Sequence, residues 1–439
     1  MWRHVPVEQA LADSAAHKHF IAMRRYVLGL LVVVYTFNFI DRQILAILLP
    51  AIKAEFDVTD TILGFLAGSA FALFYATLGV PIALLADRWN RRNLIALALA
   101  IWSGMTALSG VAANVVHLAL ARIGVGIGEA GCSPPAHSMI SDLYGPEERS
   151  TAMGIFTLGI SAGIMIAYLA GGWVAENIGW REAFLIVGLP GLVLALLVRF
   201  TIREPVRGQS DGKLDSTARP GIVDVARFLL RRKSFLHLAV GSGLASFIGY
   251  AVISFFPTFL FRSHGMNLSE IGVWLGIILG TAGGLGFAGG GYVADKLGRR
   301  GQRYALWGVA GATMLAWVFH FPVFLVGNPY LALAFFVVPA IFANFYLATT
   351  FAQIQGLVGL RMRAVASALL LFILNSVGLG LGPLLAGVLS DRLEGAFGAE
   401  SMRYSLLLVA VVIGPWSALH YVAAGRHIEG DLARSDEVD

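Results

Sequence analysis

Four charged side chains lie deep inside apolar stretches of the sequence, and all four are in its first half. They are Asp41, Arg42, Arg122 and Glu129. A charge at the centre of a membrane span costs about 2.5–3.5 kcal/mol on insertion scales, so such residues are rare and usually functional. The two acids and two bases balance each other, which favours one site where the charges pair or face a wet cavity.

The spacing of these charges limits how they can meet. Arg122 and Glu129 are about two helical turns apart, so they share a helix face but lie about 10.5 Å apart along the axis. That gap leaves room for a partner from another helix. Asp41 and Arg42 are adjacent and point about 100° apart. We expect Asp41 to face inward near Arg122, and Arg42 to reach the next helix or the edge of a cavity.

Buried carboxylates of this kind can couple protons to transport. Burial raises a carboxyl pKa, and a neighbouring arginine lowers it. A carboxylate that exchanges partner and solvent between two conformations therefore changes its proton affinity. We assign proton coupling to Asp41 and Glu129, and head-group binding or ion pairing to Arg42 and Arg122. The alternative is a static ion-pair network that orients helices.

The elements that must hold these residues are membrane-spanning helices. The chain has 439 residues, of which 57% are hydrophobic and 13% charged, whereas soluble proteins carry about 25% charged residues. Apolar stretches recur that are long enough to cross roughly 30 Å of hydrocarbon. The twelve expected spans are 27–50, 62–86, 94–113, 116–139, 151–173, 182–200, 235–261, 270–294, 304–321, 330–354, 364–389 and 403–424.

A long polar segment divides the spans into two groups of six. Residues 222–232 of this segment have the pattern of a short interfacial helix, with Val223 and Leu230 apolar and Arg227 and Arg231 basic. The expected order is a cytoplasmic amino-terminal segment (1–26), a first six-helix bundle (27–200), a cytoplasmic linker (201–233), a second six-helix bundle (234–425) and a cytoplasmic tail (426–439).

The basic residues predict the orientation in the membrane. If the amino terminus is inside, 25 of the 32 lysines and arginines fall in cytoplasmic segments, and two lie within spans. Cytoplasmic loops carry such an excess. We therefore expect a multi-pass protein of the inner (plasma) membrane with both termini in the cytoplasm. The five basic residues on the external side are Lys53, Arg181, Arg262, Arg392 and Arg403.

A repeated loop relates the two halves of the chain. The string ALLADRWNRR (83–92) follows the second span, and GYVADKLGRR (291–300) follows the eighth. Each copy has an aspartate, a basic residue, a tight turn and an arginine pair. Gly298 suits a turn that needs unusual backbone angles, and Asn90 tolerates such angles in the first copy.

These loops resemble the signature of the major facilitator superfamily. The fourth span, RIGVGIGEAG (122–131), resembles its Arg-x-x-x-Gly-x-Gly motif. The resemblance implies an all-α membrane protein with twelve transmembrane helices in two pseudo-symmetric six-helix bundles. It also implies a cytoplasmic gate made of Asp87, Arg88, Asp142, Asp295 and Arg299. The alternative is that these charges only stop helices from sliding into lipid. The second copy matches through Gly291, Asp295, Lys296, Gly298, Arg299 and Arg300, whereas the first departs at Ala83 and Asn90.

A narrower resemblance is to the spinster branch of that superfamily, which exports lipids. It rests on NFIDRQIL (38–45) and GIGEAGCSPPAHSMISDLYG (126–145). It implies roles for the matching Asp41, Arg42 and Glu129 in proton sensing and substrate handling. Related carriers of organic anions and sugar acids share a similar Asp-Arg pair. The use of 27 arginines against 5 lysines indicates a bacterial source.

The second half has aromatic and amide residues in its spans instead of comparable charges. We expect a cavity that is charged on one wall and mostly apolar on the other, although many of these aromatics alternatively pack against lipid or neighbours. Such a cavity suits a lysophospholipid or a sphingosine-1-phosphate-like lipid, moved with protons as the two bundles rock. The runner-up substrate is a small organic anion or a drug. The predicted cavity lining is Tyr35, Asn38, Phe247, Tyr250, Asn344 and Asn375.

Other classes of function fit the sequence less well. No cofactor, metal or nucleic acid is expected, since His137 and His320 are isolated from other ligands. We expect a monomer that is not an enzyme. Ser133 lies near His137, but the Gly-x-Ser-x-Gly string around Ser161 falls inside a glycine-rich span and not on a strand-to-helix turn. Nothing in the sequence predicts the soluble domain of a sensor.

Overall fold

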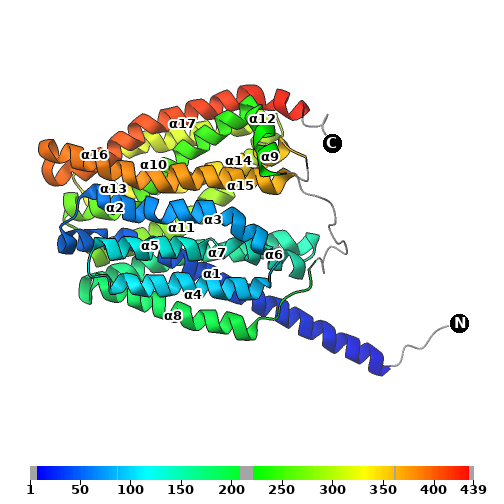
Figure 1. Cartoon of the computed structure of the whole chain (residues 1–439). Coiled ribbons are helices and arrows are strands. Elements are labelled where there is room, and N and C mark those ends of the chain that lie inside the picture. Colours follow the sequence, from blue (N-terminus) through cyan, green and yellow to red (C-terminus); the bar gives the residue numbers. More distant parts are fainter. Residues whose placement is uncertain (1–6, 87, 208–220, 360–361, 435–439) are drawn as a thin grey trace.

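A computed structural model of the chain describes residues 7–86, 88–207, 221–359 and 362–434. This described part consists of helices joined by short turns and contains no strand. Most helices run along one common direction, and the chain begins and ends at the same end of the bundle (Figure 1). We call this end the terminal end, and the other the opposite end.

The first bundle contains six spans. One span is formed by α2, the π-helical segment η1 and α3 in succession, and another by α5 and α6. The elements are α1 (Val7–Phe56), α2 (Asp60–Gly64), η1 (Phe65–Ser69), α3 (Ala70–Ala86), α4 (Arg91–Gly110), α5 (Val115–Glu129), α6 (Ser133–Leu143), α7 (Pro146–Asn177) and α8 (Trp180–Thr201).

The second bundle repeats this plan after a short helix, α9 (Ile222–Leu230), which confirms the helix predicted in the linker. Its elements are α10 (Lys233–His264), α11 (Leu268–Gly298), α12 (Gln302–Leu325), α13 (Pro329–Phe342), α14 (Phe345–Gly356), α15 (Arg363–Ile373), η3 (Leu374–Leu381), α16 (Gly382–Phe397), η4 (Gly398–Glu400) and α17 (Ser401–Ala433).

The described helices supply twelve crossings of a membrane. Eleven apolar helical stretches are long enough to cross, and the last, Arg363–Ala433, has 71 residues. As one straight helix it would measure about 105 Å. It turns back at Gly398, where φ is 54°, and α17 packs against α16, so it contains two crossings. The predicted twelve-helix fold is confirmed.

Asparagine side chains cap the amino-terminal ends of several helices. Asn114 accepts a hydrogen bond from the backbone N–H of His117 at 2.9 Å, and Asn90 accepts one from Asn93 at 2.9 Å. Such a cap satisfies a donor that has no partner within the helix. The expected unusual backbone at Asn90 is wrong, because its φ is −68°. Gly298 is likewise the last residue of α11, and the left-handed φ of 141° lies at Gly301.

The apolar core differs between the two ends of the molecule. At the opposite end, one cluster joins both bundles and includes Leu48 and Phe184 of the first with Phe256 of the second. At the terminal end there are two clusters, one built almost wholly from the first bundle around Trp102 and one from the second around Tyr421. The bundles are therefore packed together most firmly at the opposite end.

Two spans in corresponding positions of the two halves are interrupted. The fourth span breaks between α5 and α6 at Ala130–Cys132, and the tenth breaks between α13 and α14 at Ala343 and Asn344. Pro134 and Pro135 follow the first break, and proline lacks the N–H that a continuous helix needs. Interrupted spans at matching places in a repeated transporter fold point to its binding site. The break in the fourth span lies directly after Glu129.

Candidate functional site

The centre of the first bundle contains a buried ion pair that joins two spans. Arg42 of α1 donates from Nη2 to Oε2 of Glu129 at 2.6 Å and from Nε to the same oxygen at 3.1 Å. The side chains are 8% and 0% exposed, respectively. Arg42 thus reaches across from α1 to Glu129 at the end of α5.

Aromatic rings surround the guanidinium of Arg42. Its central carbon lies 4.9 Å from the ring centre of Phe39, 5.0 Å from that of Phe71 and 4.7 Å from that of Tyr75. The face of an aromatic ring attracts a cation, and the attraction is larger where water is excluded. These rings therefore attract the positive charge of Arg42 in addition to its carboxylate partner.

Polar atoms without a partner lie beside this pair. Oε1 of Glu129 accepts no hydrogen bond, and both polar side-chain atoms of Asn38 are also unpartnered although Asn38 is 1% exposed. A buried polar group left unpaired costs about 1–3 kcal/mol. These are the atoms that water, a proton or a polar group of a substrate can satisfy.

Asp41 lies on the same helix in a different environment. Asp41 is 0% exposed, and neither oxygen of its carboxylate has a hydrogen-bond partner. Arg122 is near, as predicted, but it donates to the backbone oxygen of Asp41 at 3.2 Å and not to the carboxylate. Thr106 and Trp102 of α4 lie beside the carboxylate, and their own polar atoms are unpartnered. The two acids therefore differ, since one is paired and one is not.

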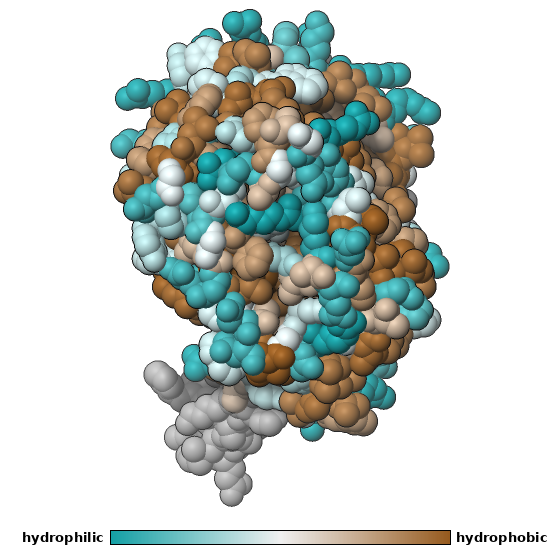
Figure 2. Space-filling model, turned by 90° about the vertical axis from the view of Figure 1, so that its left-hand side faces the viewer, coloured by the Kyte–Doolittle hydropathy of each residue, from teal (hydrophilic) through white to brown (hydrophobic). Residues whose placement is uncertain are grey.

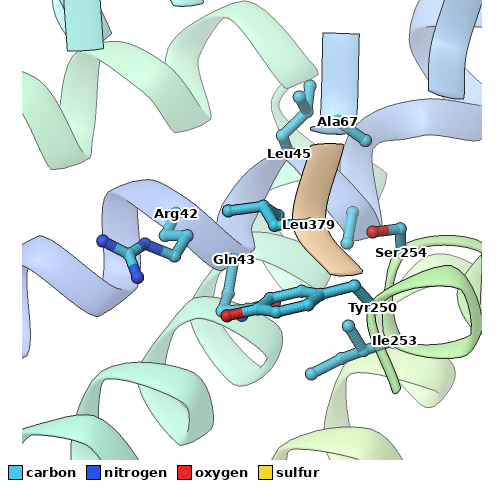
Figure 3. A pocket seen from close by; sticks show the side chains of 9 residues that line it. Arg42, Gln43, Leu45, Ala67, Tyr250, Ile253, Ser254 and Leu379 are labelled. Carbon is cyan, nitrogen blue, oxygen red and sulfur yellow. The ribbon is translucent and has the colours of Figure 1, made fainter. Parts of the chain in front are cut away.

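A small pocket connects this site to the second bundle (Figure 3). Arg42 and Gln43 of α1 lie on one side of it, and Tyr250 and Ser254 of α10 lie on the other. Its volume is about 10 Å³, which is about enough for one water molecule. A larger substrate would need the two bundles to move apart here. The remaining lining is apolar, namely Leu45, Ala46, Ala67, Ile253 and Leu379.

The other residues predicted to line the cavity are scattered. Tyr35 stacks on Phe156 with ring centres 4.3 Å apart, and Phe247 is buried in the core shared by the bundles. Asn344 lies at the break before α14. Asn375 donates to the backbone oxygen of Leu371 at 2.8 Å. Within the described residues, no group of three or more histidine, cysteine, aspartate or glutamate side chains could hold a metal ion.

The residues of the predicted gate that the structure describes lie at the terminal end. Asp87 is outside the described residues, and Arg88, Asp295 and Arg299 are exposed. Asp142 accepts a hydrogen bond from Arg91. Arg88, Asp142, Asp295 and Arg299 thus lie together at one end of the molecule, and their role as a gate stays a prediction.

Arg91 is a buried residue that the sequence did not single out. It is 0% exposed, and besides Asp142 it contacts Glu204 at 2.7 Å, Ser138 at 2.8 Å and the backbone oxygen of Pro205 at 2.9 Å. It joins the start of α4 to the end of the fourth span and to the segment after α8. In the sequence, only its place in the arginine pair of the repeated loop pointed to Arg91.

A polar cluster ties the two bundles together at the opposite end. Both oxygens of Asp60 bind Arg262 of α10, at 2.6 and 2.7 Å, and Oδ1 also binds Lys53 at 2.7 Å. Asp60 is 1% exposed. Hydrophilic residues gather across the middle of this face, and apolar residues lie along its flanks (Figure 2). We call the following residues the Asp60 cluster: Lys53, Asp60, Thr61, Arg262, Ser390 and Asp391.

The start of α2 is capped from across the interface between the bundles. Asp391 of α16 accepts from the backbone N–H groups of Asp60 and Thr61 at 2.9 and 2.8 Å. Gly64 and Gly387 allow this approach, because a Cβ atom at either position would overlap the backbone of the facing helix. The Asp60 cluster therefore combines an ion pair and a helix cap in one contact.

The Major Facilitator Superfamily matches this sequence over residues 31–383. The chain belongs to the Major Facilitator Superfamily. This facilitator is 34% identical to an MFS-type efflux pump of Mycolicibacterium smegmatis over 97% of its own length and 98% of that protein. It is 24% identical to the hexuronate transporter of Bacillus subtilis over 82% of this chain and 87% of that one.

A solved structure is similar to this facilitator over nearly its whole length. It is a crystal structure of a bacterial homologue of the human lysosomal transporter Spinster in an inward-facing and unoccupied conformation. The TM-score is 0.85 at 33% identity, covering 93% of this chain and 98% of that one. The resemblance to the spinster branch and to its bacterial members is confirmed. The protein is a multi-pass membrane transporter.

Proposed function

We propose that this transporter moves an amphiphilic lipid, of the lysophospholipid or sphingosine-1-phosphate type, together with protons. The two bundles rock about a central site that opens to each side of the membrane in turn. The observation that carries the proposal is the buried pair of Arg42 and Glu129, next to the unpartnered carboxylate of Asp41.

Competition for Arg42 provides a route to coupling. A guanidinium binds a phosphate or a carboxylate through two parallel hydrogen bonds. In this structure Glu129 occupies Nε and Nη2 of Arg42. A proton on Glu129 removes its negative charge and frees the guanidinium for an anionic head group. Loss of that proton restores the pair and displaces the head group, so substrate and proton exchange are linked.

The composition of the pocket supports an amphiphile. Arg42 is the charged residue of the pocket lining, whereas Ile253 and Leu379 of the second bundle are apolar and lie near the polar Tyr250 and Ser254. An anionic head group would meet Arg42, and an apolar tail would meet Ile253 and Leu379. The similarity to the Spinster homologue supports the same class of substrate, an amphiphilic lipid. The alternative substrate is a small organic anion or a drug, supported by the similarity to the hexuronate transporter and to the efflux pump.

The remaining assignments belong to the same proposal. The terminal end faces the cytoplasm across the inner membrane, as the distribution of basic residues indicates. Asp87, Arg88 and Asp142 form the cytoplasmic gate of the first bundle, and Asp295 and Arg299 form the matching loop of the second. Arg122 binds the head group together with Arg42, and the transporter acts as a monomer.

Transport by the purified protein in liposomes tests the choice of substrate. With a pH gradient across the membrane, we expect a lysophospholipid to cross faster than in protein-free liposomes and a hexuronate to cross at the protein-free rate. Collapsing the pH gradient with a protonophore should lower the rate at which the lysophospholipid crosses the membrane. If the protein transports the hexuronate but not the lysophospholipid, a lipid substrate is excluded and the substrate is a small organic anion.

A further inference from the structure

The helix α9 runs across the terminal end of the second bundle, whereas most other helices run along the bundle axis (Figure 1). It packs on α10 and α15 of the second bundle. Val225 and Leu229 point into that bundle, and both are 0% exposed. The face of α9 that carries Val225 and Leu229 is therefore buried against the second bundle.

A second apolar face of α9 is exposed in the described part of the structure. Ile222 is 41% exposed, Val223 67% and Leu230 58%. At 100° per residue these three side chains lie on one side of the helix, next to the buried face. A helix bathed in water would have polar residues there. The pattern is typical of a helix that lies in the interface of a bilayer.

Basic side chains border this apolar face. Arg227 and Arg231 follow it around the helix, and both are exposed, as is Lys233 at the start of α10. Arg227 has one acidic neighbour, Asp224, at 3.8 Å, and the two side chains are 64% and 69% exposed. Such an exposed pair contributes little, so the arginine can exchange it for another anion.

We propose that α9 is a membrane-surface anchor that recognises anionic phospholipid. Ile222, Val223 and Leu230 insert at the boundary between head groups and acyl chains, and Arg227 and Arg231 bind the lipid phosphates. Charge complementarity identifies the occupant, since the leaflet facing the cytoplasm is negatively charged. Because α9 packs on α10 and α15, this contact fixes the terminal end of the second bundle at the membrane surface.

Site-directed labelling tests this contact in the full-length protein. Cysteine is introduced at Val223, on the apolar face, or at Asp224, on the water face. The native Cys132 is buried, so labelling is selective. The label is an environment-sensitive fluorophore, and the vesicles contain phosphatidylcholine with or without phosphatidylglycerol. We expect the label at position 223 to be quenched by spin-labelled lipid in anionic vesicles, and the label at 224 by aqueous iodide.

The charge dependence gives the second readout. Each basic residue near an anionic surface contributes about 1 kcal/mol, or about fivefold in partitioning. We therefore expect Arg227→Gln to lower the ratio of lipid-inserted to water-exposed label by about fivefold at a fixed phosphatidylglycerol fraction. The control is Arg303→Gln, which removes an exposed charge at the terminal end on a different helix, α12, where Arg303 pairs with Glu429; it should have no effect.

Two results would overturn the proposal. Equal iodide quenching at positions 223 and 224 in anionic vesicles would show that the apolar face stays in water. Quenching by lipid that is independent of phosphatidylglycerol would exclude recognition of anionic lipid. Both leaflets of these vesicles have the same composition and no substrate is present, so neither result depends on the orientation or substrate proposed above.

Discussion

Replacing Glu129 with glutamine should abolish transport driven by a pH gradient. The substitution keeps the shape of the side chain but removes its charge and its ability to release a proton. It also leaves Arg42 with no counter-ion at a position where its side chain is 8% exposed. Removing one partner of a buried pair costs about 3–5 kcal/mol, so the thermal stability of the purified protein should fall as well.

A second variant separates coupling from stability. In Arg42→Gln/Glu129→Gln both charges are gone, so the uncompensated buried charge that destabilises the single variant is absent. We expect the double variant to recover the melting temperature but not proton-driven transport. Recovery of both would show that the pair only orients helices.

Asp41→Asn provides a matched control at the other acid. The carboxylate of Asp41 accepts no hydrogen bond, and Arg122 binds only its backbone oxygen. The substitution should therefore leave the melting temperature close to that of the parent protein, while proton-driven uptake is lost. Retained proton-driven uptake in both Asp41→Asn and Glu129→Gln would refute the assignment of these two acids.

The second large effect is expected at the opposite end of the molecule. Asp60→Asn removes the only acid that faces both Lys53 and Arg262 in the described part of the structure. The loss of about 3–5 kcal/mol would shift the balance between closed and open forms of this end by about two to three and a half orders of magnitude, since about 1.4 kcal/mol is tenfold. The contact lies between bundles, so the shift favours their separation there.

Spin labels on the two bundles can measure this shift. Ala54 and Glu394 are exposed at the opposite end, one in each bundle, and cysteines at these positions accept labels. We expect the label-to-label distance to lengthen in Asp60→Asn. Glu55→Gln is the control, because Glu55 pairs with Arg181 within the first bundle at the same end. An unchanged distance in Asp60→Asn would mean that the shared apolar core alone holds this end closed.

The sequence predicted the fold because composition and periodicity are properties of single segments. The twelve spans, the helix at 222–230 and the gathering of four charges in the first bundle all depend on local apolar pattern or on the high energy of a charge in lipid. The signature loop then identified the superfamily through Asp295 and its neighbours. Each of these features can be recognised without knowing how any two helices are rotated against each other.

Pairing within the site could not be predicted in the same way. Arg42 binds Glu129, and Arg122 binds a backbone oxygen, because helix rotation and side-chain rotamers select among several reachable partners. The Asp60 cluster joins residues that are 202 and 330 positions apart in the chain, so no local pattern reveals it. The break after Glu129 was only partly predictable, from the two prolines Pro134 and Pro135 that follow it.

The cap that Asp391 places on α2 makes the local order of one bundle depend on the position of the other. When the bundles part at the opposite end, the first N–H groups of α2 lose their acceptor, and Thr59, which accepts from Ile62 at 3.4 Å, is a weak replacement. The first turn of this five-residue helix must then fray or bind water. The amide hydrogens of Asp60 and Thr61 should therefore exchange with solvent mainly while this end is open, so their exchange rate reports the population of the open form.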